Sequence, residues 1–141
     1  MIGRVLGARD LIVGVLIVII LMQFPLISPV AAAFDFSIEA SPSSNTINLG
    51  KSDSLSLRAT YTVSVTLTSG PPESVTLSVS GKPVSLSVFK PSSVSPTMSG
   101  PVSSMLTVET TANFLPGSYP VTITGKGGGV THSTTVTLNV K

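Results

Sequence analysis

The chain contains no cysteine and no tryptophan, and its one histidine is His132. Without cysteine no disulfide can compensate for a thin core, so packed apolar side chains and hydrogen bonds must hold the fold. A single histidine excludes a metal site built on a histidine pair, and a Ser-His catalytic pairing would have to use His132 itself. We therefore expect a non-enzymatic protein with no metal, no cofactor and no catalytic residues.

Charged residues are also scarce, at 10% of the chain, with a formal net charge of +2. Two of the eight basic residues and one of the six acidic residues lie within the first 33 positions, so six basic and five acidic residues follow them. The sequence pI near 9.2 therefore does not indicate a basic patch. We expect no nucleic-acid partner.

Neither the acidic residues nor the glycine-rich stretch forms a pattern typical of catalysis or phosphate binding. Asp35 and Glu39 would share one face of a strand, but four residues at about 3.3 Å each separate them by roughly 13 Å. This spacing is too wide for two carboxylates that share a proton or act as a glycosidase acid and base. Gly127–Gly129 lacks the helix and lysine of a phosphate-binding loop, so it predicts a loose hairpin turn.

The first 33 residues have the pattern of an export signal. Arg4 and Arg9 precede an apolar run over 11–22, and Ala31–Ala33 supplies small residues at a cleavage position. We expect a hydrophobic leader helix that is removed after residue 33. The alternative is an uncleaved anchor that crosses the membrane through 11–27. In both cases the rest of the chain is exported, to the cell surface or the extracellular space.

The stretch 55–68, LSLRATYTVSVTLT, alternates apolar or small residues at odd positions with polar residues at even positions. This period of two predicts a β-strand with one buried face. Fourteen residues at about 3.3 Å each span roughly 46 Å, longer than an ordinary strand. We expect this strand to organise the domain over 34–141.

Shorter runs with the same alternation follow one another between turns rich in glycine, proline and serine. One begins at Val84 and is expected to bury Val88. The proline-containing run 91–101 is expected to be a loop, because proline cannot donate to a strand ladder. The predicted strands besides the long one cover 34–39, 75–80, 84–89, 105–111, 119–124 and 131–140, and 46–49 is a candidate for a further short piece.

About seven strands and no amphipathic helix in roughly 100 residues predict an all-β, immunoglobulin-like Greek-key sandwich. The stretches 36–42, 89–96, 116–125 and 129–138 resemble Ser/Thr-rich immunoglobulin-like modules of archaeal and bacterial secreted and cell-surface proteins. The resemblance covers nearly all of 34–141. It implies the fold, but such modules serve as spacers, adhesive domains or appendages of enzymes.

Tyr119 follows Pro116-Gly117 at the start of a late strand. This position resembles the tyrosine corner of Greek-key sandwiches, in which the phenol hydroxyl ties a loop to the sheet. We therefore expect Tyr119 to have a structural role. The alternative is an exposed ring that stacks on a ligand.

The favoured function is a structural or adhesive protein of the cell surface that contacts other surface proteins, or copies of itself, through its strand edges. One alternative is a filament subunit that donates its segment 34–40, with Phe34, Phe36 and Ile38 inserted into a neighbour. Another is a carbohydrate- or peptide-binding module, although two tyrosines and five phenylalanines supply few rings for stacking. The membrane is expected as a partner only through 11–27, if the leader is retained.

Overall fold

The computed structural model describes residues 30–50, 57–82, 86–111 and 113–141. The predicted leader helix, the segment 11–27, the first two residues of the run 55–68, and Val84 lie outside the described residues. Within the described ranges, no helix is both long and apolar enough to cross a bilayer. Residues 31–141 form one unit of the chain, and the fold below is that of this unit.

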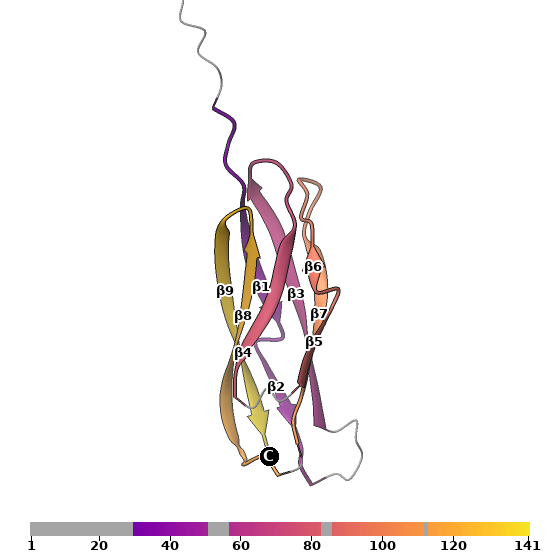
Figure 1. Ribbon diagram of the computed structural model, residues 1–141. Helices are drawn as coiled ribbons and strands as arrows, with labels where there is room; N and C mark the ends of the chain where they lie inside the picture. Colours follow the sequence, from indigo (N-terminus) through magenta and orange to yellow (C-terminus); the bar gives the residue numbers. More distant parts are fainter. Residues whose placement is uncertain (1–29, 51–56, 83–85, 112) are drawn as a thin grey trace, which may run out of the picture. The chain divides into compact units, whose positions relative to one another are not determined.

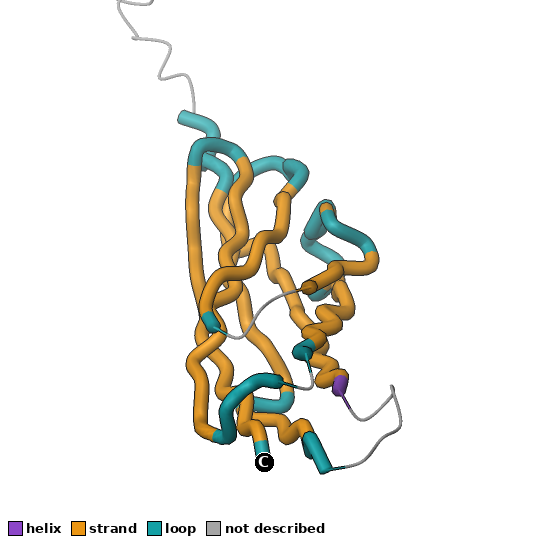
Figure 2. Tube along the Cα trace, turned by 60° about the horizontal axis from the view of Figure 1, so that its bottom comes forward, coloured by secondary structure: helices purple, strands orange, loops and turns teal. Residues whose placement is uncertain are grey.

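The described part of this unit is all-β, with nine strands in two facing sheets (Figures 1 and 2). In sheet A the order is β1-β3-β7-β5. In sheet B it is β2-β9-β8-β4-β6. The strands are β1 Asp35–Ser41, β2 Ser44–Ile47, β3 Arg58–Ser69, β4 Val75–Gly81, β5 Leu86–Lys90, β6 Ser93–Val94, β7 Val102–Glu109, β8 Gly117–Gly127 and β9 Val130–Val140. The predicted all-β sandwich is confirmed.

The core lies between the two sheets and follows the alternation of the sequence. In β3 the odd positions from Ala59 to Leu67 are buried, while the even positions are exposed or half-buried, as predicted. The same inward alternation holds at Val121 and Ile123 of β8 and at the end of β9. The buried apolar side chains are Phe34, Phe36, Ile38, Ile47, Ala59, Tyr61, Val63, Val65, Leu67, Val75, Leu77, Val94, Leu106, Val108, Val121, Ile123, Val136, Leu138 and Val140.

The chain changes sheets within two extended stretches. After β1 in sheet A it crosses to sheet B, where β2 runs parallel to β9 from the pair Ser44–Thr137 to the pair Ile47–Val140. After β5 in sheet A it crosses again, and β6 pairs antiparallel with the start of β4. All strand pairs other than β2 with β9 are antiparallel.

The second crossing corrects two predictions. The described residues hold nine strands rather than about seven, and the run 91–101 is not entirely a loop. Ser93 and Val94 pair with Thr76 and Val75, and the Val94 side chain is buried. The prolines at 91 and 96 flank this two-residue strand, so neither has to donate a hydrogen bond within it.

The inward face predicted for the strand near Val84 was wrong at Val88. Val88 is 46% exposed, whereas its neighbour Phe89 is half-buried and packs against the core. In β5, Phe89 is opposite Leu106 of β7, and Leu106 is fully buried. Directly opposed residues share a sheet face, so this register turns Phe89 inward and Val88 outward.

The turn at Gly127–Gly129 is tight rather than loose. Gly127 pairs with Val130, which leaves Gly128 and Gly129 as a two-residue connection with φ of 54° and 78°. Positive φ at both central residues is the requirement of the type I′ hairpin turn, whose twist matches that of the strands it joins. The two glycines therefore set an uninterrupted register from Gly127 back to Gly117.

Candidate functional site at the β1 and β9 edge

One side of the sandwich carries an edge strand from each sheet. β1 is the outermost strand of sheet A, and it contacts β9 of sheet B. β2 covers only the last part of β9, from Thr137 to Val140. We call residues 130–136 of β9, on the side away from β8, the open edge, because no described strand pairs with them there. Figure 1 shows β1 and β9 beside one another.

The side chains predicted to form a donor strand are packed into this chain's own core. Phe34, Phe36 and Ile38 are each no more than 9% exposed. The rings of Phe34 and Phe36 lie with centroids 5.6 Å apart, and β1 pairs with β3 over its whole length. In this structure β1 therefore completes its own sheet.

Gly125 of β8 makes room for this packing. A Cβ atom at Gly125 would lie 3.0 Å from Phe36 Cε2, 3.0 Å from Val75 Cγ1 and 3.4 Å from Ile38 Cδ1. The missing side chain thus leaves the space that the Phe36 ring fills between the sheets. Because Gly125 is opposite His132 in the β8–β9 ladder, the Phe36 ring also comes to lie near His132.

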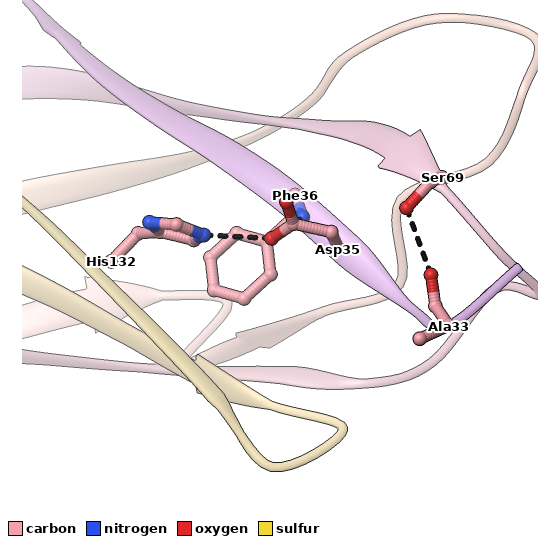
Figure 3. A network of polar contacts seen from close by, with 5 residues as sticks. All are labelled: Ala33, Asp35, Phe36, Ser69 and His132. Carbon is pink, nitrogen blue, oxygen red and sulfur yellow. Dashed lines mark hydrogen bonds and ion pairs between the residues drawn. The ribbon is translucent and has the colours of Figure 1, made fainter.

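Asp35 and His132, which are 97 positions apart in the sequence, meet at this edge (Figure 3). His132 Nε2 lies 2.7 Å from Asp35 Oδ1, and the imidazole packs edge-on against Phe36 with a centroid distance of 5.0 Å. The β1–β3 register shifts between Asp35 and Phe36. A bulge of this kind changes the direction in which a side chain points, and here the Asp35 carboxylate points toward His132 of sheet B.

The pKa of Asp35 is lowered, first by the hydrogen bond to His132 and then by the hydrogen bond that the Phe36 backbone N–H donates at 2.9 Å. Both partners favour the ionised carboxylate. The imidazole and carboxylate are each about half exposed, so water competes for this contact. Among the described residues, no group of three or more His, Asp or Glu side chains could hold a metal ion.

The bond at which cleavage is predicted lies next to this edge. The Ala33 carbonyl accepts a hydrogen bond of 2.8 Å from Ser69 Oγ (Figure 3). The next residue, Phe34, is 5% exposed. A protease that needs an extended segment on both sides of this bond must therefore act before β1 has packed, or after β1 has opened. Cleavage at this position stays a prediction.

Tyr119 lies at the start of β8, half-buried, and its hydroxyl donates a 2.9 Å hydrogen bond to the carbonyl of Leu115, four residues earlier. Its ring also packs against Phe114, with centroids 5.1 Å apart. This is the type of hydrogen bond that a tyrosine corner makes. Its contribution to stability stays a prediction.

Tyr61 is a structural residue that the alternation pattern identified only as core. It is 1% exposed, and its hydroxyl donates to the Thr137 carbonyl at 2.9 Å and accepts from the Asn45 backbone N–H. The phenol of sheet A thus lies between β2 and β9 of sheet B. Burial raises the pKa of Tyr61 to about 12. A tyrosine in an otherwise aliphatic inward row was the available signal, because a buried hydroxyl needs a partner.

The outer face of sheet A carries the exposed apolar side chains Val88 and Met105. They line a shallow open hollow together with Arg58, Lys90, Thr107 and Glu109. Arg58 Nε and Glu109 Oε1 are 2.8 Å apart within it. Its lining contains no aromatic ring on which a sugar could stack.

No known protein-family profile and no curated protein matches the sequence. Among solved structures, the chain is similar to surface layer protein SbsC, domains 1–6, with 18% identity, a TM-score of 0.51, and coverage of 83% of this chain and 14% of that chain. SbsC domains 4 and 5 give 18% identity, a TM-score of 0.49, and coverage of 77% and 53%. The structure of the Salmonella enterica SafA pilin in complex with the SafB chaperone gives 16% identity and a TM-score of 0.44, with coverage of 76% of this chain and 55% of that chain. This chain spans about half or less of each, and the first likeness shows a shared β-sandwich fold.

Proposed function

We propose that this chain is a non-enzymatic structural or adhesive module of the cell surface, exported by its N-terminal leader, with immunoglobulin-like Greek-key topology. Two facing sheets in the orders β1-β3-β7-β5 and β2-β9-β8-β4-β6 support this topology, because successive strands pass between the sheets as in immunoglobulin-like sandwiches. Its working surfaces are the strand edges and the hydroxyl-rich outer faces.

The observation that carries the proposal is the open edge of β9, lying beside β1. Sheet edges with unpaired N–H and C=O groups can accept another chain's strand, and soluble proteins usually guard them with lysine, proline or bulges. The segment 130–136 has none of these guards. A surface module can use such an edge for assembly, whereas an edge without a partner is an aggregation hazard.

Surface location is tested by labelling intact cells that express the full chain. A lysine-reactive, membrane-impermeant reagent should modify Lys126, which is exposed beside the hairpin, without cell lysis. A cytoplasmic protein expressed in the same cells is the control for leakage. Labelling that appears only after lysis would contradict the proposed location.

Strand donation by 34–40 is a second candidate, favoured by the position of β1 at the edge of sheet A and directly after the predicted leader. If β1 completed a neighbour's sheet, head-to-tail contacts could propagate as a filament. Ser37 and Thr66 are opposite one another in β1 and β3, and the chain has no cysteine. Single variants Ser37→Cys and Thr66→Cys, exported separately and mixed, should form mixed disulfides only if β1 exchanges between copies.

The double variant Ser37→Cys/Thr66→Cys is the matched control, because both cysteines then lie in one chain. An intramolecular disulfide in this variant shows that the geometry permits the bond. Mixed disulfides between the single variants, together with filaments in negative stain, would support donation. Intramolecular disulfides alone, with no mixed species, would show that β1 stays in its own domain.

A further inference from the structure

The open edge is a slot with defined ends. At its lower end the Thr137 N–H donates a 2.8 Å hydrogen bond to the Ser43 carbonyl, where β2 begins to cover β9. At its upper end β9 begins at Val130, directly after the turn Gly128-Gly129. Seven residues lie between these limits, and no described strand pairs with them on this side.

The backbone groups that face the slot follow from the hairpin register. Val130 closes the two-residue turn with Gly127, so even-numbered residues of β9 exchange hydrogen bonds with β8 and odd-numbered residues point away from it. The N–H of the odd-numbered Thr137 bonds to Ser43 rather than to β8, which confirms that the backbone groups of odd-numbered residues point away from β8. Thr131, Ser133 and Thr135 therefore present three N–H and three C=O groups to the slot.

The chemistry of the slot favours a partner with the same sequence. The segment VTHSTTV over 130–136 contains no Lys, Arg, Asp or Glu, and the Asp35 carboxylate beside it is already bonded to His132, so little like-charge repulsion opposes the approach of two copies. Its outward side chains are hydroxyls that already contact β8. Thr124 Oγ1 lies 3.0 Å from Ser133 Oγ, and Thr122 Oγ1 lies 3.4 Å from Thr135 Oγ1. A second copy would extend this row with further Ser/Thr pairs.

We propose that two copies of the chain pair through their open edges, with the two β9 strands antiparallel and Ser133 opposite Ser133 of the second copy. Only this register pairs all three residues whose backbone groups face the slot, because it also places Thr131 of each copy opposite Thr135 of the other. Six backbone hydrogen bonds follow from three such pairs. If one strand slides by two residues along the other, one of these three residues in each copy is left without a partner.

The proposed contact is two-fold symmetric and closed, so it gives a dimer with one continuous sheet and not a filament. It leaves β1 in its own domain, which distinguishes it from strand donation. The inference rests on the proposed role of the sheet edges, but not on where the protein is located. A protein that is labelled at the surface and is monomeric would overturn the dimer and leave the proposed location intact.

A cysteine at position 133 tests this register directly. Paired residues of this kind have Cα atoms about 5.5 Å apart, a separation that a disulfide can span. We expect full-length Ser133→Cys, extracted in mild detergent and oxidised gently, to form a covalent dimer. Ser78→Cys, on the exposed face of β4, is the control and should stay monomeric. Equal cross-linking of both variants, or none at Ser133→Cys, would overturn the register.

Light scattering on the cysteine-free protein, after subtraction of bound detergent, tests the interface without a covalent trap. At about 100 μM, where even a weak interface associates, we expect a dimer. Thr131→Lys adds a guarding charge to both edges and should weaken dimerisation at least tenfold, about 1.4 kcal/mol. Ser78→Lys adds the same charge to the exposed face of β4, outside the slot, and should leave the dimer intact. A monomeric wild type, or a dimer that Thr131→Lys leaves unchanged, would overturn the proposal.

Discussion

Tyr61→Phe removes one buried hydroxyl and keeps the ring that fills the core. The variant loses the 2.9 Å hydrogen bond from the hydroxyl to the Thr137 carbonyl and the hydrogen bond that the hydroxyl accepts from the Asn45 N–H, while the β2–β9 ladder still pairs these two strands. Each of the two lost hydrogen bonds is worth about 1 kcal/mol net, so we expect a loss of about 2 kcal/mol in the free energy of unfolding. For a domain of this size, each kcal/mol lowers Tm by about 4 °C, which predicts a shift of about 8 °C.

The pKa of Tyr61 supplies a second and independent signature. Because the folded state raises this pKa from 10.0 to about 12, folding favours the protonated phenol. The stability that the protonated Tyr61 hydroxyl contributes to the fold is fully present below pH 10 and is lost as the pH rises through about 12. The Tm difference between wild type and Tyr61→Phe should therefore be constant from pH 7 to 9 and shrink between pH 10 and 12.

The assay is thermal unfolding followed by circular dichroism, with Tyr119→Phe as the matched control. That variant also loses one hydroxyl, but Tyr119 is half-buried and water can reach the Leu115 carbonyl. We expect it to lose about 0.5–1.5 kcal/mol, the net value of an ordinary hydrogen bond. A Tyr61→Phe variant that melts at a lower temperature than Tyr119→Phe would support the buried hydroxyl bridge. A Tyr61→Phe variant that melts within about 1 °C of wild type would refute it.

Three further predictions concern the β1 side of the sandwich. Asp35→Asn should lower Tm near neutral pH. The pKa of Asp35 is lowered from 3.8, so the stabilisation by the carboxylate is present above that pH and is lost as the pH falls below it and the carboxylate is protonated. A Tm difference from wild type that does not decrease as the pH falls below 3.8 would contradict this. Gly125→Ala should cost about 1–3 kcal/mol by overpacking against Phe36, measured by urea unfolding, and a neutral effect would show that the ring can move aside. N-terminal sequencing of exported protein should begin at Phe34, whereas protein that still begins at Met1 would favour a retained anchor.

The inward and outward faces of most strands could be predicted from the sequence. Alternation is local, and a strand with one buried face needs apolar side chains at every second position. The buried row from Ala59 to Leu67 and the core positions of β9 were predicted for this reason. The same rule failed at Val88, because two adjacent apolar residues, Val88 and Phe89, offer two registers and only the pairing with β7 selects between them.

The tertiary structure decided everything that depends on which strands are neighbours. Asp35 and His132 appeared as isolated residues in the sequence, and they meet only because β1 ends one sheet, β9 lies beside it in the other, and a bulge turns the carboxylate. The open edge likewise exists only because β2 is short and covers four residues of β9. Alternation within a strand is a local property, whereas an edge is defined by the absence of a neighbour. Side-chain periodicity therefore determined the sandwich, and the pairing of distant strands determined where its candidate contact surface lies.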